Sequence, residues 1–79
     1  MMLLLRKLRE DKDWSRNEVA RRARIDASDY SKIERAILRP SASQIRKIAR
    51  ALSVPVENAE TLLVVVERAA ETTADEHGA

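Results

Sequence analysis

The sequence of 79 residues is poor in the residue types that build most small active sites. It has no cysteine, one histidine (His77) and one glycine (Gly78). Without cysteine there is neither a disulfide framework nor a thiolate metal site, and a lone histidine argues against a zinc site or a histidine-based catalytic pair. A single glycine excludes a glycine-rich phosphate loop and argues against hairpin architecture. We therefore expect no metal, no cofactor and no enzymatic activity.

Long apolar runs are also missing. The opening MMLLL has five apolar residues before charges follow, which is too short for a signal-peptide core or a membrane span. We expect a soluble cytoplasmic protein with no membrane partner. A chain of this length forms one domain at most, and so small a core often depends on a partner chain.

Charge is present in quantity and is divided unevenly. Residues 1–50 hold 14 Lys or Arg against 7 Asp or Glu, whereas residues 51–79 hold 1 against 6. The basic part suits an anionic partner such as nucleic acid. Two solvated faces of opposite sign would explain the same numbers.

Capping patterns predict where helices begin. Ser15 with Glu18 matches a capping box, and so does Ser41 with Gln44. Asp26 is a good N-cap for a helix between these two. Apolar residues at helical spacing add a first helix over about residues 3–12. We predict an all-α fold of five helices, the last beginning near residue 56.

The last segment allows two interpretations. Pro55 suits the first position of a helix. The three valines within Leu62–Val66 favour a strand, but the flanking Glu and Ala residues favour a helix. Since no second strand is evident to pair with, we predict an extended C-terminal helix over about 56–72. Residues 1–72 would then form a single domain, and residues 73–79 a disordered polar tail.

The second and third helices are separated by three residues, Arg24 to Asp26. Two capped helices joined by so short a turn form a helix-turn-helix, here over about residues 15–36. Tyr30 and Ile33 lie on one stripe of the second helix of this motif, and we expect both to be buried.

The ordered set Leu8-Arg9, Glu18-Val19-Ala20, Ile33-Glu34-Arg35, Pro40 and Ile48-Ala49 resembles the lambda-repressor-like DNA-binding domain, also called the Cro or XRE family. The resemblance covers about residues 5–60. It implies a five-helix bundle that binds double-stranded DNA, with the second helix of the motif in the major groove. Two positions where glycine is usual hold Arg24 and Ala36 instead.

The resemblance also implies roles for individual residues, including an internal ion pair between Arg9 and Glu34. Base contacts fall on residues at the start of the second motif helix. Phosphate contacts fall on the flanking helix starts and arginines. The implied base contacts are Ala27, Ser28, Asp29 and Lys32, and the implied phosphate contacts are Arg16, Asn17, Ser31, Arg35, Arg39, Ser41 and Ser43.

The implied reading surface is chemically modest. Ala27 could touch a thymine methyl group, Ser28 is unselective, and Asp29 could accept from a cytosine amine while repelling phosphate. Lys32 is the strongest candidate for a base contact and prefers guanine, although it could be an ordinary surface lysine. We expect affinity to rest largely on phosphate contacts.

The run LLVVV at residues 62–66 lies beyond the part of the chain that carries the resemblance. It could cover the first helix, where MMLLL needs a partner, or it could form a seam between two copies. Five consecutive apolar residues cover more than one helix face, so we predict a dimer interface, which is compatible with contact to MMLLL. The residues assigned to this interface are Leu62, Leu63, Val65 and Val66.

These expectations combine into a sequence-specific transcriptional regulator, a homodimeric repressor on a palindromic operator, associated with the nucleoid when bound. The alternative is an antitoxin-type or other protein-interaction module with the same fold and weak or no DNA reading. A protein partner would then bind the acidic C-terminal segment. Salt dependence separates the two, because phosphate contacts weaken steeply with salt.

Overall fold

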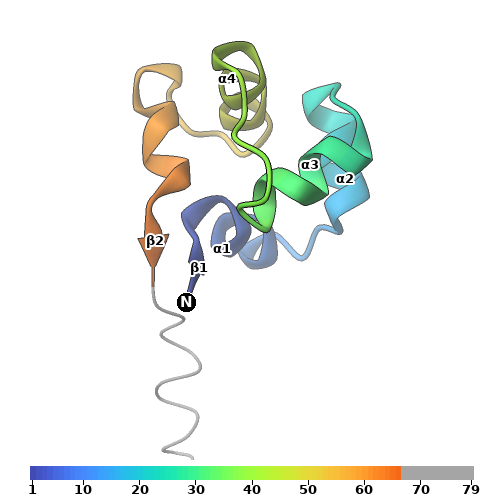
Figure 1. The fold of residues 1–79 in the computed structure, drawn as a ribbon, viewed down its shortest axis with the longest axis horizontal. Coiled ribbons are helices and arrows are strands. Elements are labelled where there is room, and N and C mark those ends of the chain that lie inside the picture. The colour runs from blue at the N-terminus through green and yellow to red at the C-terminus, as the bar shows by residue number, and fades with distance from the viewer. Residues whose placement is uncertain (67–79) are drawn as a thin grey trace, which may run out of the picture.

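A computed structural model describes residues 1–66 of the chain as five helices and two short strands (Figure 1). The predicted all-α class, a five-helix bundle containing a helix-turn-helix, is confirmed. No helix in this part of the chain has the length and apolar character of a membrane span. The elements are β1 (Met2–Leu3), α1 (Leu4–Asp11), α2 (Arg16–Ala23), α3 (Ala27–Glu34), α4 (Ala42–Ala51), the 3₁₀ helix η1 (Val56–Leu63) and β2 (Val65–Val66).

Side-chain caps fix the starts of α2, α3 and α4. The Ser15 hydroxyl accepts the amide of the third residue of α2, and Asp26 accepts two amides of α3. Ser41 and Gln44 form a reciprocal capping box at α4. The reciprocal bond predicted for Glu18 in α2 is absent, because its carboxylate instead accepts hydrogen bonds from Arg21 and Arg22 one turn along the same helix.

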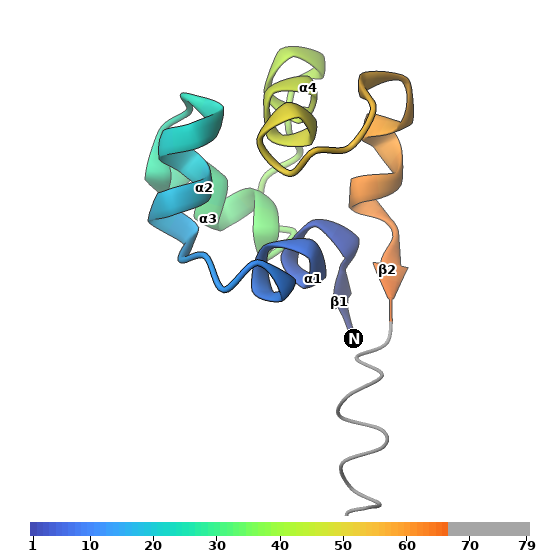
Figure 2. The same ribbon diagram turned by 180° about the vertical axis from the view of Figure 1, so that it is seen from behind.

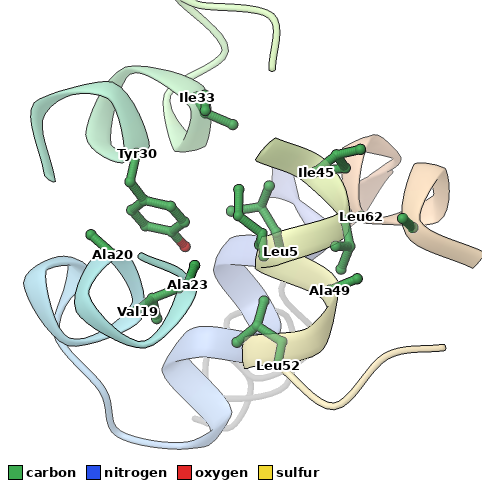
Figure 3. Packing of buried hydrophobic residues seen from close by; sticks show 12 residues of the cluster. Leu5, Val19, Ala20, Ala23, Tyr30, Ile33, Ile45, Ala49, Leu52 and Leu62 are labelled. Carbon is green, nitrogen blue, oxygen red and sulfur yellow. The ribbon is translucent and has the colours of Figure 1, made fainter. Parts of the chain in front are cut away.

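The core lies where all five helices meet (Figure 3). Tyr30 and Ile33 are buried, as predicted, with Tyr30 pointing towards the small side chains of Ala20 and Ala23 on α2 (Figure 3). Two alanines leave room for an aromatic ring between α2 and α3, so the helix-turn-helix packs tightly around one large side chain.

The prediction of an extended C-terminal helix over 56–72 was wrong in its described part. η1 begins after Pro55, is a 3₁₀ helix and ends at Leu63; beyond it, Val65–Val66 forms a strand. The partner strand missing from the sequence reasoning is Met2–Leu3, with Met2 opposite Val66 in antiparallel register. Residues 67–72 of the predicted helix and the predicted tail at 73–79 lie outside the described residues.

The same pairing moves the start of the first helix. The backbone stays extended through Leu3, so α1 begins at Leu4, and the amide of Leu4 donates to the carbonyl of Val64 at 2.8 Å. β1 and β2 lie side by side in both views of the ribbon (Figure 2). MMLLL and LLVVV therefore pack together within one chain, as a short β ladder.

Both positions where glycine would be usual take a left-handed backbone. Arg24, at the C-terminal end of α2, has φ 59°, and Ala36, just after α3, has φ 64°. A side chain in this region costs about 1–2 kcal/mol relative to right-handed backbone. The turns of the motif thus keep the geometry that glycine favours without having glycine.

Candidate nucleic-acid interface

A buried carboxylate links the three helices behind the proposed reading surface. Glu34, at the end of α3, has a side chain with no exposed area. It accepts hydrogen bonds from Arg9 of α1 through both oxygens, at 2.7 and 3.1 Å. Tyr30 donates its hydroxyl to the same carboxylate at 2.9 Å, and Arg16 of α2 donates Nε at 2.8 Å. We call Arg9, Arg16, Tyr30 and Glu34 the Glu34 cluster.

The Glu34 cluster holds its carboxylate in the charged form. Burial alone would raise the pKa of Glu34, but the hydrogen bonds from Arg9, Arg16 and Tyr30 outweigh it, and the net shift is downward. The hydrogen bond to Glu34 is also the main reason that the pKa of Arg9 is raised. A buried carboxylate is tolerated when it is fully paired. Removing it would leave Arg9 as an unpaired buried charge, which would lower the stability of the fold.

Arg16 connects this cluster to the protein surface. Its Nε is bound to Glu34, yet its side chain remains 45% exposed. The exposed part borders a groove of about 420 Å³ between the start of α2 and the start of α3. Two helix N-termini and an arginine converge there, an arrangement that suits a phosphate group. The groove is lined by Arg9, Ser15, Arg16, Asn17, Ala27 and Ser31.

The four residues proposed to meet bases are spread around α3, and Ala27 also lines the groove. Ala27, Ser28 and Lys32 are exposed, and Asp29 is half-buried. Asp26, just before them, is occupied as the cap of α3, so its charge is explained by local structure. Ser31 turns towards the groove rather than outwards and is half-buried.

A second group of proposed phosphate contacts lies around the segment between α3 and α4. Arg35 and Arg39 are exposed, and Ser41 and Ser43 are exposed at the start of α4. None of these four lines the groove between α2 and α3, so the proposed phosphate contacts fall into two separate groups. We call Lys32, Arg35 and Arg39 the outer cations; none of them forms an ion pair with another described residue.

The residues assigned to a dimer interface do not behave alike. Leu62 has no exposed area and belongs to the core, so its assignment was wrong. Leu63 is partly buried against the same core. Val65 is 55% exposed, and Val66 is half-buried. The apolar run was read as one helix surface, but it is divided between two elements: Leu62 and Leu63 end η1 against the core, and Val64 and Val65 follow on the outside.

Two contacts of Glu34 were missed by the sequence reasoning. The bond from Tyr30 could have been found, because residues four apart share one face of a helix. The bond from Arg16 joins positions 18 residues apart on different helices, and no local pattern signals it. Among residues 1–66 no group of His, Asp or Glu is placed to hold a metal ion. The arrangement can bind an anionic surface through fixed and exposed positive charge.

Comparison with known protein families gives a match. A family model described as a helix-turn-helix domain matches residues 3–62, which is most of the chain. No curated protein and no solved structure matches it.

Proposed function

Because this chain belongs to the helix-turn-helix domain family, as its match over residues 3–62 establishes, we propose that it is a sequence-specific DNA-binding transcriptional regulator. It acts as a homodimeric repressor of the lambda-repressor-like type on a palindromic operator, works without catalysis or cofactor, and resides in the cytoplasm on the nucleoid. The observation that carries this proposal is the outer side of α3, where exposed side chains stand beside cations that lack an ion-pair partner among residues 1–66.

In this mechanism the start of α3 enters the major groove. Lys32 donates to a guanine edge, and Ala27, Ser28 and Asp29 make weaker contacts with neighbouring bases. Phosphates on one side bind at the groove between α2 and α3, through Arg16, Asn17 and Ser31. Phosphates on the other side bind to Arg35, Arg39 and the start of α4. Two copies on a two-fold axis read half-sites about 34 Å apart.

Repression follows from occupancy. A dimer bound across a promoter excludes polymerase, and the amount bound depends on protein concentration. The most informative DNA to test is therefore the stretch upstream of the gene itself, because binding there would let the protein control its own level.

The test is fluorescence anisotropy of labelled upstream DNA against scrambled DNA at two salt concentrations. We expect selective binding that weakens steeply as salt rises. Lys32→Ala should lower affinity for the preferred sequence by roughly 5- to 150-fold, and Arg35→Ala should weaken binding to all sequences and reduce the salt slope by about one. Lys12→Ala and Arg50→Ala are matched controls, because both residues are exposed and neither belongs to the proposed contacts. Unchanged affinity in both test variants would remove α3 from the groove.

A second candidate is an antitoxin-type or other protein-interaction module with little DNA reading. Two observations favour it: the small or acidic side chains at positions 27–29, and the large apolar side chains exposed at Ile37, Leu38, Val64 and Val65. In that case the wild-type protein would bind upstream and scrambled DNA equally weakly at both salt concentrations, and a protein partner of the C-terminal segment would be sought.

A further inference from the structure

The large apolar side chains that remain exposed in residues 1–66 gather on one part of the surface. Ile37 is 64% exposed, Val64 53% and Val65 55%. Single exposed apolar side chains are ordinary, but a cluster of them marks an interaction site. We call this surface the apolar face; its members are Met1, Ile37, Leu38, Val64 and Val65.

Three adjoining hollows run through the apolar face. The first, about 450 Å³, has Met1 and Val65 on its wall and shares Leu3 with the second. The second, about 290 Å³, has Ile37 and Leu38 on its wall. It shares Leu63 with the third, about 430 Å³, which Val64 lines. Every member of the apolar face thus lines one of three hollows that form a continuous strip.

The third hollow also carries one charge of each sign. Arg39 and Glu60 both line it, together with Leu63 and Val64. Neither Arg39 nor Glu60 forms an ion pair with another described residue. A surface that holds a cation and an anion beside an apolar strip is complementary to itself, because a two-fold axis brings each charge opposite its counterpart.

Residues 67–79 are poorly suited to fill these hollows. Residues 67–79 contain no apolar side chain larger than alanine, and four of them are acidic. Filling an apolar hollow stabilises in proportion to the apolar area removed from water, which alanines supply poorly. A second copy brings Ile37, Leu38, Val64 and Val65 instead.

We propose that a second copy of this chain docks on the apolar face across a two-fold axis. Ile37, Leu38, Val64 and Val65 become buried between the copies, and Arg39 of each copy pairs with Glu60 of the partner subunit. This rests on the homodimer of the proposed function but requires no DNA. It replaces the fully buried Leu62 of the sequence-based interface with the segment between α3 and α4.

This interface couples assembly to the spacing of the reading helices. The segment of residues 35–41 connects α3 to α4 and supplies both Ile37 and Leu38. A two-fold axis beside this segment sets the C-terminal ends of the two α3 helices near each other, because the segment begins where α3 ends. The charge pair also engages Arg39, so dimer contact orients an arginine that the proposed function places near a phosphate.

The test is charge reversal in the full-length protein without DNA, followed by sedimentation equilibrium over a range of protein concentrations. Arg39→Glu and Glu60→Arg should each weaken the dimer by roughly tenfold or more, since the two-fold axis duplicates every lost pair. The double variant should return to within about threefold of the wild type, because reversed charges attract as the original ones do. Ile37→Lys should leave a monomer, because it places a charge in the middle of the apolar strip.

Two controls make the result specific. Arg46→Glu on α4 and Glu57→Arg on η1 change the same charges at exposed positions outside the hollows, and should leave dimerisation unchanged. Far-ultraviolet circular dichroism checks that each variant keeps its helices. A wild-type protein that stays monomeric at all concentrations overturns the proposal, and so does a double variant that is no better than the single ones.

The outcome separates this interface from the DNA-binding function. A dimer that responds to charge reversal as expected, in a protein that binds no operator, keeps the interface and ends the regulator proposal. If the protein binds its operator selectively but charge reversal at Arg39 and Glu60 leaves the dimer unchanged, the regulator proposal stands and this interface is wrong.

Discussion

The Glu34 cluster and the outer cations both lie around α3 and the segment that follows it, and they differ in their electrostatic surroundings. Arg9 and Arg16 are bound to a carboxylate with no exposed area. Lys32 and Arg35 face solvent without an ion-pair partner among the described residues. Positive charge that is already satisfied stabilises the fold, and positive charge that is unsatisfied is available to an anionic ligand. Arg16 belongs to both groups in part, since one edge of its guanidinium is bound and the rest borders the groove.

The largest effect on stability is expected in the Glu34 cluster. Glu34→Gln leaves Arg9 with a buried charge and no carboxylate, which should lower the free energy of unfolding by about 3–5 kcal/mol. Urea unfolding followed by the fluorescence of Trp14, the one tryptophan, measures it. Glu57→Gln is the matched control at an exposed position and should change stability by less than about 0.5 kcal/mol. Equal stability of the two variants would mean that the cluster does not hold the helices together.

Acid should reduce the stabilisation that the Glu34 cluster provides. The pKa of Glu34 is lowered from 4.5 in the folded chain, so the unfolded chain binds the proton more readily. The stabilisation is complete above pH 4.5 and is lost as pH falls through the lower folded pKa. Urea midpoints between pH 7 and pH 3 should show this loss in the wild type and much less of it in Glu34→Gln. Glu18→Gln removes a half-buried surface glutamate whose pKa is also lowered, and this variant should still lose most of the stability that the wild type loses in acid.

Arg16→Gln tests the residue that belongs to both groups. Glu34 keeps its bidentate bond to Arg9, so stability should fall by about 1.5 kcal/mol, the lower end of the range for a hydrogen bond to a charged group, because the Arg16 side chain is 45% exposed. Affinity for upstream DNA should fall as well, with the salt slope reduced by about one. Arg21→Gln, on the same helix but bound to Glu18, is the control for both readouts. A loss of stability with full DNA affinity would assign Arg16 to the fold alone.

The smallest effect on stability is expected at Ala36, which follows Glu34 of the cluster and Arg35 of the outer cations. Ala36 follows Glu34 and Arg35 with φ 64°, where glycine is free of the steric cost that alanine carries. Ala36→Gly should raise the free energy of unfolding by about 0.5–1 kcal/mol, less than the full steric cost because glycine also loses more entropy on folding. Ala42→Gly, in right-handed backbone at the start of α4, should act in the opposite direction. Thermal unfolding would show both.

Local features of this fold could be predicted, and distant contacts could not. Asp26 and Ser41 were recognised as caps because a cap depends on its own side chain and the next few amides. The burial of Tyr30 followed from helical spacing. The strand pairing of Met2 with Val66 and the bond from Arg16 to Glu34 depend on packing between distant segments. Nothing in either segment alone distinguishes those partners from others.

For the candidate site the same division holds. The ion pair of Arg9 with Glu34 is present, as the family pattern implied. The DNA contacts of Lys32 and the other residues stay predictions. The error at Leu62 came from treating five apolar residues as one surface. Because a 3₁₀ helix ends at Leu63 and a strand follows, Leu62 points into the core while Val64 and Val65 remain outside.

The position of Leu62 along the chain has a consequence for biosynthesis. Among residues 1–66 it is the last fully buried side chain of the core, and η1 packs on both α1 and α4. A ribosome releases the N-terminal end first, so the four α-helices emerge before the segment that packs on α1 and α4. An unfilled leucine site costs a domain about 2–5 kcal/mol, a large part of the stability of so small a fold. The helix-turn-helix is therefore synthesised early, but it is held in a stable fold only after η1 has been synthesised as well.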